Sequence, residues 1–191
     1  MTFRESDMTI DATQLLAELR QDHRNMAVLL NLLQQEIDRI DRPDESPDFE
    51  LLHDIMRYMT VYPDATHHPK EDLIYAGMQA KKPELAKGLE AVEVDHKEIA
   101  ELGKRLLDDI EAIVAGTIVV RERVIGDTQQ YVHRLRKHMT WEEEDLFPRA
   151  DSMGDDLKLD TSHLDATDPV FGAQRETSFA NLSQTIDREP Q

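Results

Sequence analysis

Two short segments of the sequence each place a glutamate four residues after a histidine. His67 is followed by Glu71, and His138 is followed by Glu142. On an α-helix, side chains four residues apart leave the same face one turn apart. An imidazole and a carboxylate held together in this way form a mixed nitrogen and oxygen ligand pair, which suits iron, zinc or manganese. The two pairs are therefore candidate metal ligands.

Four long segments must position these pairs, and each has the apolar periodicity of an amphipathic helix. They cover about residues 13–40, 48–80, 84–115 and 119–149. Pro63 and Pro69 lie inside the second segment, so we expect a kink or a short break there. Short connections between long helices favour antiparallel neighbours. The sequence thus predicts an all-α protein, with an up-down-up-down four-helix bundle in residues 1–150 and an irregular C-terminal tail.

The tail, residues 151–191, is acidic and lacks sustained periodicity. We expect at most a short helix in it, from about residue 174 to 186. Its apolar residues predict that the tail packs either on its own bundle or on a second subunit, in which case the chain forms a homodimer. These residues are Leu164, Val170, Phe171, Phe179 and Leu182.

Each apolar stripe also carries a histidine where the pattern requires an apolar residue. His23 interrupts the first stripe and His96 the third, while His67 and His138 continue the second and fourth. The glutamates that follow the last two histidines lie on the same stripes. An ionised carboxylate in an apolar interior is costly unless it is paired or binds a metal. The stripes hold no lysine or arginine, which leaves the histidines or a cation as partners.

The polar residues of the four stripes lie at one height along the predicted bundle. At a rise of about 1.5 Å per residue, all four histidines are roughly 15–20 Å from the same end. Two histidines per metal and two bridging glutamates suit a dinuclear site. A single additional oxygen bridge would leave each metal one open position, where a small molecule could bind or react. The predicted metal ligands are His23, His67, Glu71, His96, His138 and Glu142.

A rival pattern is the Glu-x-x-His spacing of carboxylate-rich helical bundles, which occurs twice. Glu50 precedes His53, and Glu93 precedes His96, in this way. Both pairs lie near the starts of adjacent helices that run in opposite directions, so they would lie at opposite ends of the bundle. We reject this pattern and expect His53 and Glu93 to be boundary or surface residues.

Other residues could surround the metals. His68 is adjacent to a predicted ligand but points about 100° away on an α-helix, toward solvent or the surroundings of the site. Tyr131 either approaches an open metal position or is a core residue. The remaining candidates are two aromatic residues that could wall the site and two histidines expected to be exposed: Tyr75, Trp141, His133 and His163.

The composition excludes several classes of protein. The sequence has no cysteine, so it has no disulfides, thiolate metal sites or cysteine nucleophiles. The formal net charge of −18 argues against nucleic acid and anionic membranes as partners. No stretch approaches the roughly 18 consecutive apolar residues of a membrane span, and the first residues contain no apolar signal region. We therefore expect a cytoplasmic protein that binds neither nucleic acid nor membrane.

The same residues resemble the hemerythrin-like family, whose members carry a His-His-Glu cation-binding domain. The resemblance covers about residues 11–150 and rests on Asp22-His23, His67 to Tyr75, Asp95-His96 and His138 to Pro148. The stretch from Asp168 to Gly172 is similar to the tails of some bacterial members. The resemblance implies a non-haem centre of two Fe ions with an oxo or hydroxo bridge, held by the six predicted ligands. Zinc or manganese would also fit these ligands.

One position departs from the oxygen-carrying branch of this family. That branch has a fifth histidine one turn after the third-helix ligand, where this sequence has Ala100. The difference leaves a second open or labile position and argues against simple reversible oxygen carriage. The ligand set is also similar to that of the iron-centre repair proteins, which usually carry an additional cysteine-bearing domain.

The resemblance therefore implies a metal-binding protein that binds or senses a small oxidant such as O₂, NO or peroxide. The alternatives are a diiron oxidoreductase that consumes peroxide or NO, and an iron donor for iron–sulfur cluster repair. Whether the protein is an enzyme is left open by the sequence.

Overall fold

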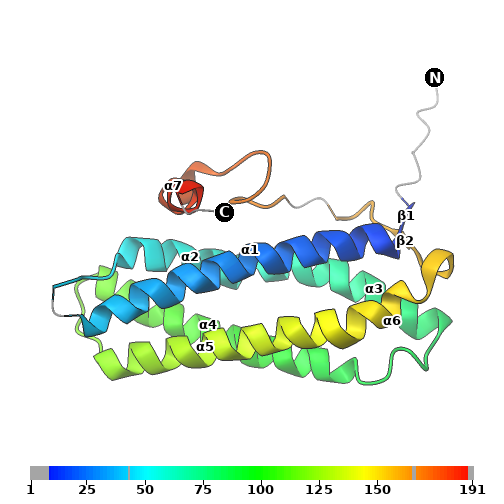
Figure 1. The fold of residues 1–191 in the computed structure, drawn as a ribbon, viewed down its shortest axis with the longest axis horizontal. Helices are drawn as coiled ribbons and strands as arrows, with labels where there is room; N and C mark the ends of the chain where they lie inside the picture. Colours follow the sequence, from blue (N-terminus) through cyan, green and yellow to red (C-terminus); the bar gives the residue numbers. More distant parts are fainter. Residues whose placement is uncertain (1–8, 43, 165–166, 189–191) are drawn as a thin grey trace.

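The computed structural model describes residues 9–42, 44–164 and 167–188, and within these ranges four long helical rods dominate (Figure 1). The first rod is α1 (Ala12–Asp38), and the third is α4 (Glu90–Val114). The second joins α2 (Phe49–Tyr62) to α3 (His68–Lys81), and the fourth joins α5 (Arg121–Trp141) to α6 (Phe147–Asp151). The prediction of an all-α protein is confirmed.

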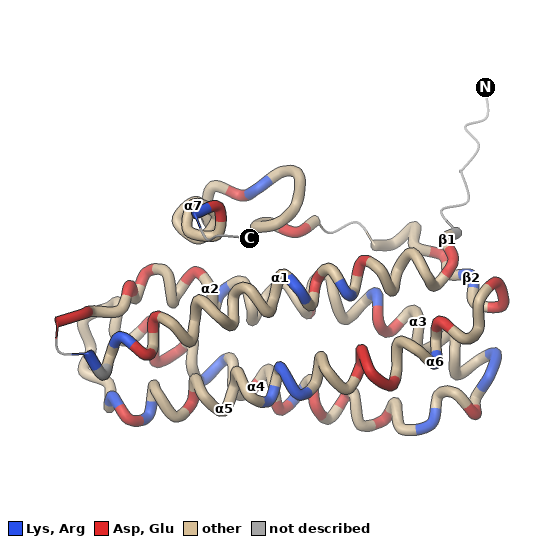
Figure 2. The backbone as a smooth tube through the Cα atoms, in the orientation of Figure 1, with Lys and Arg blue, Asp and Glu red and all other residues tan. Residues whose placement is uncertain are grey.

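The rods lie side by side along the longest axis of the molecule (Figure 1). α4 contacts both α2 and α5, and α1 contacts α5 and α2. The connections after α1, which include the short turn η1 (Arg39–Asp41), and after α4 lie at one end of the molecule. The connection between α3 and α4 lies at the other end. Acidic and basic residues are spread along every rod (Figure 2).

The second and fourth rods each contain one π-helical turn. These turns are η2 (Pro63–His67), between α2 and α3, and η3 (Glu142–Leu146), between α5 and α6. The kink or break expected near Pro63 is therefore a widened turn within a continuous helical rod. A proline lacks the N–H that an α-helical turn requires, and a π turn is one way to accommodate it. His67 ends the first of these turns and Glu142 begins the second, so both turns lie at predicted ligands.

The third helix begins later than the sequence predicted. α4 starts at Glu90 rather than near residue 84, because residues 82–89 form a series of hydrogen-bonded turns. Gly88 has a φ of 92°, in the left-handed region that glycine adopts without steric cost. The residues before Glu90 therefore cover the end of the bundle instead of extending the rod.

Two apolar clusters fill the interior, and every rod passes from one cluster to the other. In α1, Leu19 belongs to the smaller cluster and Met26 to the larger one, with His23 between them. In α4, Val92 belongs to the smaller cluster, and Leu102 to the larger one. The predicted ligands lie at the boundary between the two clusters, which makes them a polar layer in an otherwise apolar interior.

The segments outside the rods pack on this bundle. β1 (Thr9–Asp11) pairs in antiparallel fashion with β2 (Lys158–Asp160), a ladder too short for the sequence to indicate. The tail continues through the turns η4 (Gly154–Asp156) and η5 (Thr177–Phe179) to α7 (Ala180–Arg188), which contacts α2. The apolar tail residues Val170, Phe179 and Leu182 are buried in the larger cluster of their own chain. In the described part of the chain, no helix combines the length and the apolar character needed to cross a membrane.

Candidate metal centre

The structure brings the six predicted ligands together in the polar layer. α1, α4 and α5 each supply one histidine, η2 supplies another, and the glutamates come from the first turn of α3 and the first residue of η3. Both glutamates are fully buried, and three of the histidines are nearly so, whereas His96 is partly exposed. The residues of the layer are His23, His67, Glu71, His96, His138 and Glu142.

Glu71 lies between histidines from two different rods. Its Oε1 is 3.0 Å from Nε2 of His67, and its Oε2 is 3.5 Å from Nε2 of His96. A carboxylate that directs one oxygen to each side is suited to bridging two cations.

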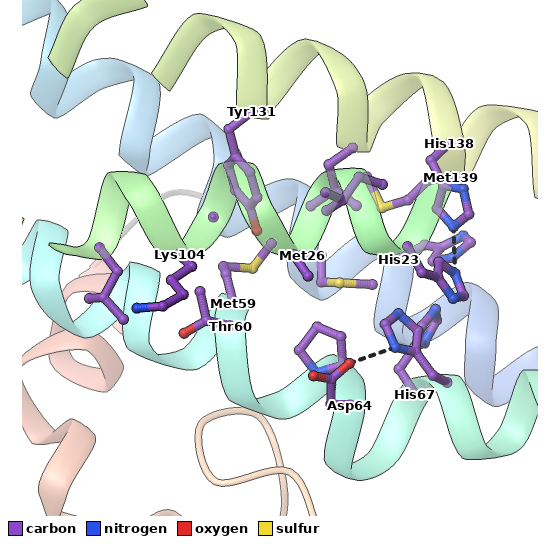
Figure 3. Close-up of a pocket in the computed structure, with 18 of the residues that line it drawn as sticks. His23, Met26, Met59, Thr60, Asp64, His67, Lys104, Tyr131, His138 and Met139 are labelled. Carbon is purple, nitrogen blue, oxygen red and sulfur yellow. Dashed lines mark hydrogen bonds and ion pairs between the residues drawn. The ribbon is translucent and has the colours of Figure 1, made fainter. Parts of the chain in front are cut away.

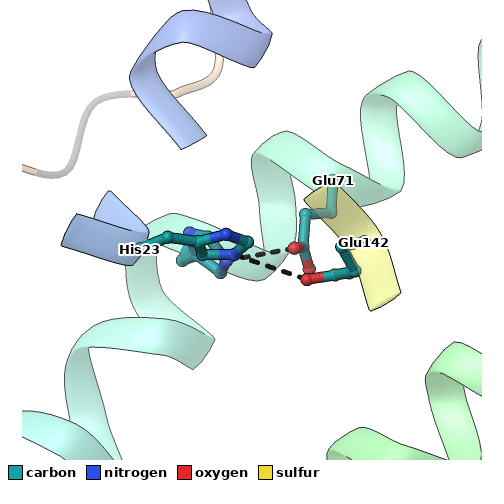
Figure 4. Close-up of side chains that lie close together, drawn as sticks. His23, Glu71 and Glu142 are labelled. Carbon is teal, nitrogen blue, oxygen red and sulfur yellow. Dashed lines mark ion pairs between the residues drawn. The ribbon is translucent and has the colours of Figure 1, made fainter. Parts of the chain in front are cut away.

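Glu142 occupies the matching position from the other half of the bundle. Its Oε2 is 3.4 Å from Nε2 of His23 and 3.4 Å from Nε2 of His138. Its Oε1 accepts a hydrogen bond of 2.9 Å from the hydroxyl of Tyr75. Figure 4 shows the Glu71 and Glu142 carboxylates next to each other, in front of His23. The two glutamates therefore share one side of the layer.

Several donor atoms of the layer form no hydrogen bond with one another and are arranged as metal ligands would be. In the described part of the chain, His23 Nε2, both Glu71 oxygens and Glu142 Oε2 are buried without a hydrogen-bond partner. Buried polar atoms are normally paired, so a group of unpaired ones needs an explanation. Nε2 of His96 lies 3.0 Å from Nε2 of His138. Two ligands at right angles on one metal, each bonded at about 2.1 Å, would lie about 3 Å apart.

Three of the histidines direct Nε2 into the layer and Nδ1 toward a carboxylate outside it. In metal sites the second ring nitrogen of a ligating histidine usually donates to such a group, which fixes the orientation of the ring. His23 and His67 form contacts of this kind, with Glu143 at 2.9 Å and Asp22 at 3.3 Å. Nδ1 of His138 lies 3.5 Å from Asp95 but has no hydrogen-bond partner in the described chain.

Two of these outer carboxylates repeat one arrangement in the two halves of the bundle. Asp22 precedes His23 in α1 but faces His67 of the neighbouring rod. Asp95 precedes His96 in α4 but faces His138 of its neighbouring rod. Sequence reasoning assigned neither aspartate a role. The signal that could have found them is an acidic residue directly before a ligand histidine in both halves.

Burial and charge shift the protonation of the layer. Burial, and then the charge of Glu142, raise the pKa of Glu71 to about 8. Burial also opposes ionisation of Glu142, but its close contact with His23 and the charges of the nearby imidazoles hold its pKa well below its usual range. Burial alone would lower the pKa of His67, but the charge of Glu71 and a hydrogen bond to Asp22 raise it to about 10. A divalent cation bound here would displace these protons.

His68 lies against the layer, which is the second of the two surroundings that we expected for it. Its ring stacks on that of His96 with centroids 3.8 Å apart, and its Nδ1 is 3.0 Å from Oδ1 of Asp64. A donor atom of His68 lies within 4.8 Å of donor atoms of Glu71 and His96. The step of 100° per residue holds for an α-helix, whereas His68 follows a π turn, in which each residue turns the chain by less. Burial lowers the pKa of His68 to about 3, so its imidazole is neutral and can act as a ligand.

The other candidates have simpler surroundings. Tyr75 touches the layer through Glu142, as described, and Trp141 lies edge-on to His138 with centroids 6.3 Å apart. His53 is 3.7 Å from Glu111, and Glu93 pairs with Lys97 at the surface, both away from the layer. The two histidines expected to be exposed are exposed: His133 and His163.

A cavity of about 310 Å³ adjoins the histidines of the layer (Figure 3). Ala100 lines it, and so do His68 and His96. Ala100 is exposed. The layer is therefore accessible from this cavity through His68 and His96.

Comparison with known proteins gives one finding. The family model of the hemerythrin HHE cation binding domain matches residues 14–150. The match includes all six residues of the polar layer and ends before the tail. Neither the curated proteins nor the solved structures include a match to this chain.

Proposed function

The chain belongs to the hemerythrin family of HHE cation-binding domains, and we propose that it holds two iron ions in the polar layer of an up-down-up-down four-helix bundle. We further propose that these ions bind or sense a small oxidant such as O₂, NO or peroxide. The observation that carries the proposal is the set of buried, unpaired donor atoms described above, which a cation would satisfy.

Three overlapping sets of donor atoms support two ions rather than one. His23, His67 and both glutamates form the first set, His96 and His138 form the second with Glu142, and His68 and His96 form the third with Glu71. Glu142 belongs to the first and second sets, and Glu71 also reaches His96. Each ion would therefore take two histidines, and the two glutamates would bridge the ions.

The donor set is nitrogen and carboxylate oxygen without sulfur, which suits iron while also accepting zinc or manganese. Iron bound in this layer would supply the electrons for binding an oxidant. The chain itself holds the imidazoles in place through the outer carboxylates of Asp22, Asp95 and Glu143. The apolar clusters on both sides keep bulk water away from the fully buried glutamates. A small molecule would approach from the cavity, where His96 is partly exposed.

The oxidoreductase alternative has one observation in its favour. The cavity beside His96 is much larger than a diatomic molecule requires, so it can admit peroxide together with water. Turnover needs entry of substrate and exit of product, and an open cavity allows both.

Metal analysis of the purified chain and its variants tests the proposal. We expect about two iron ions per chain, and a sharp loss of iron in His138→Ala and in Glu71→Ala, because each residue contributes a donor atom to the layer. His133→Ala is the matched control for the first variant, since His133 is exposed on the same helix, α5. Full iron retention in His138→Ala and Glu71→Ala would contradict the site.

Two further measurements separate the functions. An optical band that appears with O₂ and reverses under vacuum supports binding, whereas steady consumption of peroxide or NO supports the oxidoreductase. His68→Ala should keep most of the iron but change this band, because His68 stacks on a proposed ligand and can itself reach the second ion. An unchanged band in His68→Ala would show that His68 plays no part at the metals.

A further inference from the structure

The cavity extends well beyond the proposed metal layer. Along α4 it is lined from His96 to Asp108, which at about 1.5 Å per residue is a length of about 18 Å. The ions would occupy only the end formed by the histidines. The part near Lys104 has no role in holding the metals and is free for another occupant (Figure 3).

The walls of this cavity are mostly apolar. They come from α1, α2, η2, α3, α4 and α5, and methionines from three of these helices take part. Ligand pockets in proteins are typically apolar clefts of about 300–1,000 Å³ with a few polar groups, and this cavity is of that kind. Methionine side chains adapt their shape to an occupant and make favourable contacts with aromatic rings. The apolar residues that line it include Met26, Met59, Ile99, Leu107, Leu135 and Met139.

One polar group at the wall of this apolar space has no partner within the described protein. Tyr131 is 1% exposed, and Figure 3 shows its hydroxyl directed into the cavity toward Met59. Among the residues that the structure describes, none forms a hydrogen bond with this hydroxyl. Burial raises the pKa of Tyr131, so the hydroxyl keeps its proton and can donate it. An occupant that brings an acceptor can bond to this donor in place of water, and the net value of such an exchange is modest.

Gly103 of α4 makes room for this tyrosine. A Cβ at this position would lie 3.0 Å from Cε2 of Tyr131 and 3.3 Å from Cγ2 of Thr60. A larger residue would push the Tyr131 ring, so the glycine allows the phenol to lie where it does.

The charged side chains that line the cavity are already paired with neighbouring residues. Lys104 donates to both carboxylate oxygens of Asp108, each over 3.1 Å, and Asp64 is bonded to His68. The middle of the cavity therefore offers no free charge to an ionic ligand. Its chemistry favours a neutral molecule.

We propose that this cavity binds a neutral, one-ring aromatic molecule with a single carbonyl or hydroxyl oxygen, which accepts a hydrogen bond from Tyr131. The size fits, because a dry apolar cavity of about 150 Å³ in another protein holds benzene. This inference goes beyond the proposed function, since it concerns the cavity beside the metal layer and does not require the ions.

Binding of two probes of the same shape tests the proposal. Acetophenone carries the acceptor, and isopropylbenzene lacks it. Sealed equilibrium dialysis against the full chain, both iron-loaded and treated with a chelator, measures their affinities. We expect saturable binding of both probes, with acetophenone bound more tightly. Tyr131→Phe should weaken acetophenone by roughly 2- to 10-fold, the value of one hydrogen bond, and leave isopropylbenzene unchanged.

A second variant tests the location. Ala100 is an exposed helical residue at the cavity, so Ala100→Leu should fill its mouth without unfolding the chain and weaken both probes by at least about fivefold. Ala91→Leu is the matched control, because Ala91 is also exposed on α4 but does not line the cavity.

Three results would each overturn the proposal: no saturable binding, equal effects of Ala100→Leu and Ala91→Leu, or equal effects of Tyr131→Phe on both probes. Probe binding to a chain that takes up no iron would uphold this inference and refute the proposed function instead.

Discussion

Replacing Tyr75 with phenylalanine removes one hydroxyl and keeps the ring, so it isolates a single hydrogen bond to the polar layer. The hydroxyl donates to Oε1 of Glu142 over 2.9 Å. Burial raises the pKa of Tyr75 far above its usual range, so the hydroxyl stays protonated. Despite its own burial, Glu142 has a lowered pKa because His23 and the neighbouring imidazoles stabilise its charged form. The bond therefore joins a neutral donor to a charged acceptor.

The cost of losing this bond follows from its burial. Glu142 is 0% exposed and Tyr75 is 8% exposed, so solvent has little access to replace the lost donor. A hydrogen bond to a charged group contributes about 1.5–3 kcal/mol, and for a chain of this size that corresponds to a decrease of about 3–12 °C in Tm. In the metal-loaded chain, loss of a hydrogen bond to a ligand should weaken metal affinity by roughly 10- to 100-fold.

Thermal unfolding followed by circular dichroism measures the first effect, and metal titration measures the second. Tyr131→Phe is the matched control, because it makes the same chemical change at another buried tyrosine, whose hydroxyl has no partner in the described chain. The control should change the free energy of unfolding by less than about 1 kcal/mol. Equal shifts for the two variants, or unchanged stability in Tyr75→Phe, would refute the reasoning.

Two further predictions concern protons and the tail. Metal binding near pH 7 should release about two protons per chain, because ligands must be deprotonated and the pKa values of Glu71 and His67 are raised to about 8 and about 10. The release should fall toward one proton above pH 8, where Glu71 is already ionised but His67 is not; calorimetry in buffers of different ionisation enthalpy measures it, and a release independent of pH would contradict the prediction. Asp168→Ala should lower the free energy of unfolding by about 2–4 kcal/mol in chemical denaturation, because Asp168 accepts hydrogen bonds from the Tyr58 hydroxyl and two backbone amides. Asp187→Ala, which removes only an exposed pair, should cost less than about 1 kcal/mol, and equal losses would exclude Asp168 as the anchor of the tail.

The periodicity of the sequence was enough to predict the all-α fold and to bring six polar residues to one layer. This worked because apolar stripes define which face of each helix is buried, and because a histidine on such a stripe is buried with it. The height along each helix depends only on the number of residues, so no knowledge of side-chain contacts was needed.

The periodicity of the sequence could not predict the two π turns. Periodicity assumes a constant angle per residue, and Pro63 signals a disturbance without specifying whether the helix breaks, bends or widens. The structure shows a widened turn that ends at His67. The sequence left the surroundings of His68 open for the same reason, because its direction depends on the rotation of that one turn. A local change in helical geometry thus brought an additional imidazole to the proposed metal site.

The contacts of the outer carboxylates could not be predicted from the sequence either. Asp22 and Asp95 contact histidines of neighbouring helices, so their partners depend on the relative rotation of two helices rather than on spacing within one. The same aspartate–histidine contact occurs in both halves of the bundle, which indicates a shared structural role. Asp22 also binds Lys70, and Asp95 also binds Arg134, so each carboxylate joins an imidazole of the layer to a cation outside it. A carboxylate that faces Nδ1 favours the proton on that nitrogen, which leaves Nε2 free to face a metal.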